Sequence, residues 1–178
     1  GKALKDVDFD IAFCSPLTRT KQTAAPIVEG RNIPFILEDR LREVDFGICE
    51  GAYIAPAKEN KDDPMHEYFA APQNYIPPEG AESIEELQTR AQKFLDMLSE
   101  MAASDESVHT VLAASHGAAL RGIMSCINHC ELKDFWRSGL SNCCVYKIHL
   151  ENNVWVEDGL MHPIEEAEQS KSGKTKEA

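Results

Sequence analysis

The sequence is poor in positive charge and has no long apolar run. Eighteen lysine and arginine residues stand against thirty aspartate and glutamate residues, which gives a formal net charge of −12. Nucleic acids and anionic membranes are bound through a basic face, so this balance disfavours both as partners. No apolar stretch approaches the length that crosses a bilayer. We therefore expect a cytoplasmic protein in which any anionic ligand binds in a local basic pocket.

The six cysteines do not form a metal-binding pattern. Cys126, His129 and Cys130 form the densest group, but the sequence has no second Cys-x-x-Cys pair to complete a metal site. Their spacing places them on one face of a helix instead. A chain of this size can bury a core without disulfides, so we expect reduced thiols and no metal.

The composition, with 43% hydrophobic and 27% charged residues in a chain of 178, is that of a globular domain. We expect one domain over residues 1–162. Residues 52–79 contain five prolines and have no sustained period, which is typical of a lid or a surface insertion with one short helix. Residues 163–178 are expected to form a disordered tail, because no large apolar side chain occurs after residue 164.

Stretches with strand periodicity alternate with stretches that have helical spacing. The clearest helix runs from Ile84 to Met101, begins with a capping box at 83–86 and carries one apolar stripe. A hairpin is expected at 144–156 with its turn at Asn152-Asn153. The other expected elements are strands at 9–14, 34–37 and 108–114 and helices that begin near residues 17 and 118. Alternating strands and helices favour an α/β fold.

The strand at 108–114 ends on Ser115-His116-Gly117, and a helical pattern follows at once. A turn of this kind lies at the carboxyl end of a strand, where ligands bind in α/β sheets. The unpaired N–H groups that open the helix are suited to an anion. His116 is thus a candidate binding or catalytic residue. The alternative is an ordinary turn in which His116 bonds a neighbouring carbonyl group.

The segment from Ser15 to Ala24 repeats this arrangement of strand, turn and helix start. Ser15-Pro16 is expected to cap the helix and to supply its first-turn proline, which places Arg19 over the same edge of the sheet. An arginine fork beside a helix N-terminus makes a phosphate site, because both present N–H groups to an oxyanion. The alternative is a surface arginine paired with an acid.

Cys14 and Arg19 invite comparison with the Cys-x5-Arg loop of cysteine phosphatases. Four residues rather than five separate them, and Pro16 removes one backbone N–H group from the loop. We therefore do not expect Cys14 to be a nucleophile.

Four motifs occur in a fixed order. They are Ser15 to Ala24, Arg40 to Gly47 with Glu50-Gly51, Gly80 to Ser83 with Arg90, and Ser115-His116-Gly117. In this combination the sequence resembles the histidine phosphatase superfamily, the phosphoglycerate-mutase-like proteins, over about residues 1–157. The resemblance implies a three-layer α/β/α sandwich and phosphoryl transfer through a phosphohistidine.

The resemblance also implies roles for particular residues. Arg19 matches the phosphate-clamping arginine, with Ser15 and Gly117 as further phosphate-binding residues. His116 matches the second active-site histidine, which binds the transferred phosphoryl group. Glu43 matches the proton donor to the leaving oxygen, and the same carboxylate could then activate water. No metal or other cofactor is implied, because histidine, arginine and helix N-termini supply the positive charge.

Glu43 has a simpler alternative role, as a salt-bridge partner of Arg40 or Arg42.

The sequence departs from the family at one point: it contains no Arg-His-Gly triplet. In the family this triplet ends the first, central strand and supplies the nucleophilic histidine. Gly1 to Val7 resembles the last turn of the helix that follows that strand, so we expect an N-terminal truncation. The chain as printed is then expected to be catalytically inactive, to lack a central strand and to fold poorly.

The residues favour a phosphatase acting on a small phosphorylated metabolite over a mutase. Lys58, Lys61 and His66 are the basic side chains between Glu43 and Gly80, and a mutase needs a more basic segment to bind phosphoglycerate and exclude water. A non-catalytic module that binds a phosphorylated ligand or a partner protein is the third alternative. The oligomeric state is left open.

Tyr53, Tyr68, Phe69 and Tyr75 are expected either to line the leaving-group pocket or to form a small core of their own.

Overall fold

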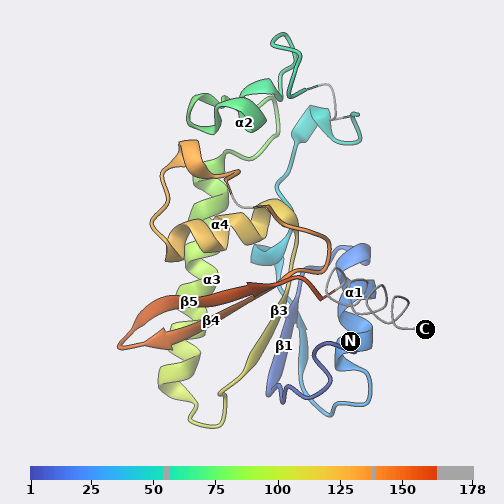
Figure 1. Cartoon of the computed structure of the whole chain (residues 1–178), viewed down its shortest axis with the longest axis vertical. Coiled ribbons are helices and arrows are strands. Elements are labelled where there is room, and N and C mark those ends of the chain that lie inside the picture. The colour runs from blue at the N-terminus through green and yellow to red at the C-terminus, as the bar shows by residue number, and fades with distance from the viewer. Residues whose placement is uncertain (54–56, 138, 164–178) are drawn as a thin grey trace, which may run out of the picture.

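Figure 1 shows the chain as a computed structural model, which describes residues 1–53, 57–137 and 139–163. Three short parallel strands form the main sheet in the spatial order β2-β1-β3. They are β1 (Ile11–Cys14), β2 (Phe35–Leu37) and β3 (Val111–Ala114). A parallel sheet whose strands are connected through helices confirms the α/β fold.

Helices cover both faces of β1. In Figure 1, α1 (Thr18–Val28) and α3 (Ile84–Ser104) lie on opposite sides of the parallel strands, and α4 (Gly117–Ile127) packs with α3. All four residues of β1 are buried, and Phe13 meets Phe94 of α3 edge to face with ring centroids 5.9 Å apart. A strand buried on both faces is apolar along its whole length. The arrangement is the three-layer α/β/α sandwich expected from the sequence.

The helix α3 forms as the sequence predicts. Both bonds of the capping box are present: Ser83 Oγ accepts the Glu86 N–H group at 3.1 Å, and the Glu86 carboxylate accepts the Ser83 N–H group at 2.8 Å. The apolar stripe is buried at Ile84, Leu87, Ala91, Phe94, Leu95 and Leu98, Met101 is half-buried, and the helix ends three residues beyond the expected end at Met101. Their burial against β1 and α4 anchors the helix layer.

The strand β3 begins three residues later than predicted. The Asp10 carboxylate accepts the N–H groups of His109 and Thr110 at 2.7 and 2.8 Å, so these groups are not available for strand pairing. The same contacts lower the pKa of Asp10, because N–H donors stabilise its charged form. The other end of β3, which precedes His116, lies where the sequence placed it.

Residues 3–6 form a turn, in which the Val7 N–H group donates to the Leu4 carbonyl group at 3.2 Å, and the interpretation of Gly1 to Val7 as a helix end stays a prediction. The Arg31 guanidinium donates to the backbone carbonyl groups of Leu4 at 2.7 Å, of Lys5 at 3.3 Å and of Val7. An arginine that bonds carbonyl groups in this way satisfies backbone acceptors that have no partner in a helix or strand.

The C-terminal hairpin is a separate two-stranded sheet. β4 (Val145–Glu151) and β5 (Val154–Met161) pair in antiparallel fashion, and β5 extends past the predicted end at residue 156. Asn152 and Asn153 have φ values of 50° and 63°, as a two-residue turn with both residues left-handed requires. Among the described residues, no strand pairs with the edge of β3 that faces away from β1.

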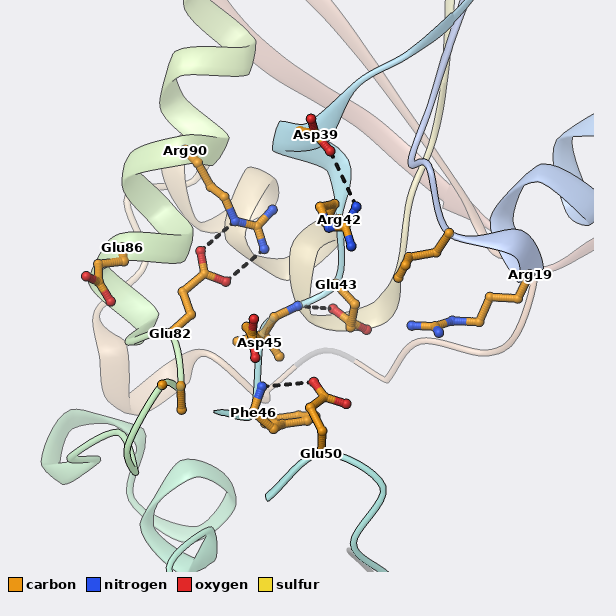
Figure 2. Close-up of a pocket in the computed structure, with 14 residues that line it drawn as sticks. Arg19, Asp39, Arg42, Glu43, Asp45, Phe46, Glu50, Glu82, Glu86 and Arg90 are labelled. Atoms are coloured by element: carbon orange, nitrogen blue, oxygen red, sulfur yellow. Dashed lines mark hydrogen bonds and ion pairs between the residues drawn. The ribbon is translucent and has the colours of Figure 1, made fainter. Parts of the chain in front are cut away.

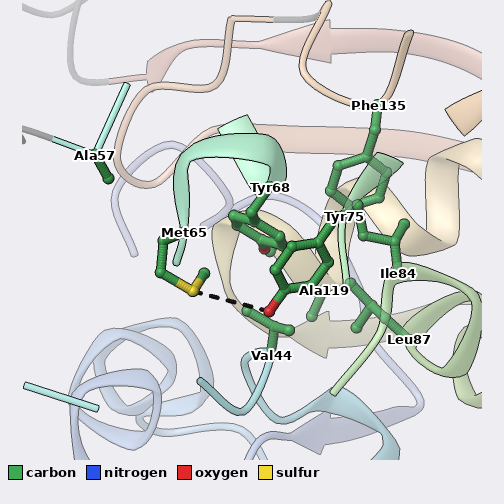
Figure 3. Close-up of a cluster of buried hydrophobic side chains, with 10 residues drawn as sticks. Val44, Ala57, Met65, Tyr68, Tyr75, Ile84, Leu87, Ala119 and Phe135 are labelled. Atoms are coloured by element: carbon green, nitrogen blue, oxygen red, sulfur yellow. Dashed lines mark hydrogen bonds between the residues drawn. The ribbon is translucent and has the colours of Figure 1, made fainter. Parts of the chain in front are cut away.

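Residues 52–79 contain one short helix, α2 (His66–Ala70), as predicted. Tyr68, Phe69 and Tyr75 pack with Trp136 into an aromatic core, part of which Figure 3 shows. Tyr53 is 82% exposed. The described residues also form short 3-10 helices at Asp39–Leu41, Gly47–Cys49, Pro72–Asn74 and Leu132–Asp134.

No helix within the described ranges is long and apolar enough to cross a membrane. Of the predicted disordered tail at 163–178, all but Pro163 lies outside the described residues.

Candidate active site

Two strand ends bring the candidate site together. Cys14 at the end of β1 pairs with Ala114 at the end of β3, and the Ser15 N–H group donates to the Ala114 carbonyl group at 2.9 Å. The residues that follow both strands therefore lie at the carboxyl edge of the sheet. Arg19 and His116, which are 97 positions apart in the sequence, meet at this edge.

The His116 imidazole is fixed by three side chains. Arg19 Nε donates to Nδ1 at 3.2 Å, while Nε2 lies 2.7 Å from Ser15 Oγ and 2.9 Å from Thr20 Oγ1. A guanidinium group can only donate, so Nδ1 is the unprotonated nitrogen. The neutral ring then carries its proton on Nε2 and donates it to one of the two hydroxyl groups.

Burial lowers the pKa of His116 below its ordinary value. The negative charge of Glu43 opposes this shift, whereas the positive charges of Arg19, Arg90 and Arg42 add to it. The imidazole is therefore neutral near pH 7, in agreement with the tautomer that the hydrogen bonds require.

Arg19 presents its charge to the outside of the site. It lies in the first turn of α1 and its side chain is exposed. Nε is bound to His116, but the two Nη groups make no hydrogen bond or ion pair within the part of the chain that the structure describes. The structure therefore does not support the alternative of a surface ion pair, and the open fork suits a tetrahedral anion.

Ser15 does not cap α1, which corrects the prediction for Ser15-Pro16. The N-cap residue is Leu17, and no side chain bonds the helix there. Ser15 is fully buried, and its hydroxyl group is engaged with His116 at 2.7 Å. In this structure Ser15 orients the histidine, and its direct contact with phosphate stays a prediction.

Glu43 holds the beginning of α4. Its Oε1 accepts the N–H groups of Ala118 at 3.2 Å and Ala119 at 3.1 Å, together with its neighbour Val44 at 3.1 Å. The helix N–H groups that the sequence assigned to an anionic ligand are thus taken by a carboxylate of the chain itself. The nearby Gly117 is exposed, and its role in binding phosphate stays a prediction.

The alternative of an ion pair between Glu43 and Arg40 or Arg42 is wrong. Arg40 pairs with Glu38 at 2.7 Å, and Arg42 lies 3.4 Å from Asp39. Glu43 is thus bound to the end of a helix and remains available for acid–base chemistry.

A pocket of about 780 Å³ opens in front of these residues, as Figure 2 shows. Six carboxylates and three guanidinium groups line it. Its charged residues are Arg19, Arg42 and Arg90 and Asp39, Glu43, Asp45, Glu50, Glu82 and Glu86. Arg90 forms a two-pronged pair with Glu82 at 2.6 and 2.9 Å, which neutralises one wall. The unpaired positive charge of the pocket is that of Arg19, which lies beside His116. The wall opposite Arg19 carries the carboxylates of Asp45 and Glu50.

A close backbone contact builds the acidic wall. Phe46 pairs with Ala81, and the Ile48 N–H group donates to the Glu79 carbonyl group at 3.0 Å. Gly47 lies between them with φ of 55°, where an added Cβ would be 2.2 Å from the Glu79 oxygen. Only glycine fits there, so this residue allows the two loops of the pocket to meet.

Cys14 is excluded as a nucleophile by its position. The residue is fully buried, its thiol donates to the Ser15 carbonyl group at 3.2 Å, and burial raises its pKa. A thiol that is protonated and buried does not attack a phosphate ester.

Three contributors were not named as site residues from the sequence, namely Thr20, Arg42 and Arg90. Thr20 falls on the buried face of α1 together with Ala24. A hydroxyl group on an otherwise apolar face was the available signal, because a buried hydroxyl group needs a partner. The partner is His116.

Together, the fold and the pocket define an α/β protein suited to hold an anion at the carboxyl edge of its sheet, beside one carboxyl group. Comparison with known sequences identifies the family. The chain belongs to the histidine phosphatase superfamily (branch 1), whose sequence profile matches residues 1–161.

The relatives have phosphatase and mutase names. Phosphoserine phosphatase 1 from Hydrogenobacter thermophilus is 28% identical over 142 residues, which cover 80% of this chain and 65% of the relative. The probable phosphoglycerate mutase GpmB from Klebsiella pneumoniae is 29% identical over 159 residues, covering 89% and 72% of the two chains. The chain thus spans just under two thirds of the length of the first of these relatives.

Solved structures share the fold. YhfR from Bacillus stearothermophilus superimposes with a TM-score of 0.78 at 23% identity, covering 88% of this chain and 76% of that one. Phosphoglycerate mutase from Bacillus anthracis gives a TM-score of 0.69 at 24% identity, covering 88% and 74%. The phosphoglycerate-mutase-like architecture expected from the motifs is confirmed.

Proposed function

We propose that this chain is the larger part of a phosphomonoester hydrolase that acts on a small phosphorylated metabolite through a phosphohistidine. The observation that carries the proposal is the contact of Arg19 with His116 beside Glu43. The chain supplies the phosphate clamp and the acid–base group. The histidine that attacks phosphorus belongs to an Arg-His-Gly segment that this sequence does not contain.

In the proposed reaction, the free Nη groups of Arg19 hold the oxygens of the transferring phosphoryl group, and the Nε2–H group of His116 exchanges its hydroxyl partner, Ser15 or Thr20, for one of those oxygens. These donors offset the charge on those oxygens as the ester bond breaks. Glu43 gives its proton to the leaving oxygen, which departs as an alcohol. The resulting carboxylate then takes a proton from water as that water attacks the phosphohistidine and releases phosphate.

The open edge of β3 supports the proposal that the missing nucleophile arrives on a strand. β3 pairs with β1 alone in the part of the chain that the structure describes, and the β4–β5 hairpin forms its own sheet. A parallel strand beside β3 would end at the same edge as His116, so a histidine at its end would face the clamp.

The charge of the pocket favours hydrolysis over mutase chemistry. A mutase must hold a substrate that carries a carboxylate as well as phosphate, whereas the wall opposite Arg19 carries Asp45 and Glu50. Carboxylates there repel a second anionic group. One relative carries a phosphatase name and another a mutase name, so the relatives alone do not decide between the two.

Binding of inorganic phosphate to the 178-residue chain tests the clamp. We expect Arg19→Gln to weaken phosphate binding about tenfold to a hundredfold, the effect of losing a charge-assisted hydrogen bond. Lys21→Gln is the matched control, because Lys21 is an exposed cation on the same helix. Titration calorimetry measures both, and equal losses in the two variants would contradict a specific clamp.

Turnover distinguishes the enzyme from a binding module. A protein that carries this chain together with an Arg-His-Gly segment is expected to release inorganic phosphate from a panel of phosphate esters and not to isomerise phosphoglycerate. Phosphate binding without turnover in that protein would favour the non-catalytic alternative.

A further inference from the structure

The hydroxyl group of Tyr68 is buried without a hydrogen-bond partner among the described residues. Tyr68 lies on α2, and its side chain is fully buried. An unsatisfied buried hydroxyl group costs stability, and a phenylalanine would fill the same space without that cost. A tyrosine here therefore calls for a role for the hydroxyl group itself.

Aromatic rings surround Tyr68 and prevent it from turning out to water. Phe46, Phe69, Tyr75 and Trp136 meet its ring with centroid distances of 5.4, 4.9, 5.0 and 5.1 Å. The Trp136 indole N–H group also donates to the Tyr68 backbone carbonyl group. The position of the phenol is thus fixed by packing from several elements, as Figure 3 shows in part.

The phenol is packed behind the pocket, close to the proton donor. Phe46 lines the pocket and also meets the Tyr68 ring edge to face. The buried cluster that contains Tyr68 also contains Val44, Ala118 and Ala119, whose N–H groups hold Glu43. Burial, and after it the charge of Glu43, raise the pKa of Tyr68 far above its ordinary value. The hydroxyl group therefore stays protonated and can donate.

The Glu43 carboxylate has capacity for a further donor. Oε1 accepts three N–H groups, at 3.1, 3.2 and 3.1 Å. Oε2 has one long contact, 3.4 Å from the Ala118 nitrogen. A carboxylate oxygen with one weak partner can accept a phenol proton without breaking an existing bond.

We propose that Tyr68 is a positioning residue that donates a hydrogen bond to the Glu43 carboxylate when the phosphate site is occupied. With an ester bound, the bond forms as Glu43 passes its proton to the leaving oxygen and its carboxylate becomes charged. With inorganic phosphate, the anion beside Arg19 repels the already ionised carboxylate toward the phenol. The proton of Tyr68 remains on its own oxygen throughout. This inference rests on the proposed function.

Kinetics of the protein that includes the Arg-His-Gly segment give the first test. Tyr68→Phe is expected to lower kcat about tenfold to a hundredfold with KM within twofold of the parent value, because the bond acts after substrate has bound. The melting temperature is expected to stay the same or to rise, since an unsatisfied hydroxyl group is removed. Tyr75→Phe, in the same aromatic cluster, is the matched control with unchanged kcat. A Tyr68→Phe variant with the parent kcat, or one that loses activity and stability together, would overturn the proposal.

Magnetic resonance of the 178-residue chain gives a test without turnover. The chain contains four tyrosines, so labelling at the Cζ carbon gives four signals that single Tyr→Phe variants assign. Inorganic phosphate is expected to shift the Tyr68 signal in the parent chain and to leave it in place in Glu43→Ala. A shift that is absent in the parent chain at saturating phosphate, or that persists without Glu43, would overturn the proposal.

The two proposals fail in different ways. If the parent protein neither binds phosphate nor turns over an ester, the proposed function is wrong and this inference falls with it. If the parent protein is active while Tyr68→Phe matches it, only the inference is wrong.

Discussion

At the scale of single residues, the protonation state of His116 is set by a neighbour that can donate hydrogen bonds but cannot accept them. Arg19 has no acceptor atom, so its contact with Nδ1 leaves His116 neutral and directs the Nε2 proton toward Ser15 and Thr20. Burial acts in the same direction and lowers the pKa of His116. The ring is thus held in one orientation and one protonation state before any ligand arrives, which reduces the cost of reorganisation on binding.

The lowered pKa of His116 predicts a stability that depends on pH. In the unfolded chain, His116 has its ordinary pKa of 6.5. As the pH falls, the unfolded chain therefore takes up a proton on this residue at a higher pH than the folded chain does. The free energy of unfolding should therefore fall as the pH drops below 6.5 toward the folded-state pKa. His116→Gln should lose less stability between pH 7.5 and 5.5 than the parent chain, as urea denaturation at the two pH values would measure. Equal losses would show that His116 titrates alike in both states.

At the scale of elements, helix ends explain much of the architecture. The N-terminus of α3 is capped by the reciprocal hydrogen bonds of Ser83 and Glu86, which are three positions apart in the sequence. The N-terminus of α4 is capped by the Glu43 carboxylate, and Glu43 is 75 positions away from Ala118 in the sequence. The first cap forms locally, whereas the second one exists only when the fold has placed two loops at one edge.

Ser83→Ala should lower the free energy of unfolding by about 1 kcal/mol, the usual cost of losing an N-cap side chain. Thr89→Ala is the control, because Thr89 is an exposed hydroxyl residue in the interior of the same helix and bonds the Glu85 carbonyl group. Alanine favours helix at that position, so the control should be neutral or slightly stabilising. Urea denaturation midpoints compare the two, and equal effects would argue against the capping box as a source of stability.

At the scale of the whole molecule, the main sheet has three strands in the described residues, and one of its edges is β3. β3 has a neighbour on one side among the described residues, and the β4–β5 hairpin packs as a separate unit. Strand edges without partners leave backbone groups to be satisfied by other means. Under the proposed function, a strand that carries the Arg-His-Gly triplet would pair with this open edge of β3.

The printed chain alone is therefore expected to have no turnover on phosphate esters, even where it binds phosphate. The physical reason is that no histidine other than His116 occurs in the matching motifs, so a phosphohistidine has no residue on which to form. A sensitive assay of inorganic phosphate release from p-nitrophenyl phosphate checks this. His116→Gln serves as the background control, and turnover by the parent chain above that background would contradict the expectation.

Local patterns predicted the elements well where neighbouring residues decide them. The helix α3, the turn at Asn152-Asn153 and the strand β1 follow from capping, turn and burial preferences over a few residues. Predictions failed where a distant side chain intervened. Asp10 shortens β3, because its carboxylate takes the N–H groups of His109 and Thr110, which lie about a hundred positions away in the chain.

The sequence by itself determined the α/β fold, the family and the identity of Arg19, Glu43 and His116 as candidate site residues. The tertiary structure alone decided their partners: Ser15 and Thr20 hold the histidine, Glu43 closes α4, and Tyr68 lies behind the pocket. The reason is physical. Periodicity and turn preferences act between neighbours in the chain, whereas hydrogen bonding and charge act through space and depend on which strand ends the fold brings together.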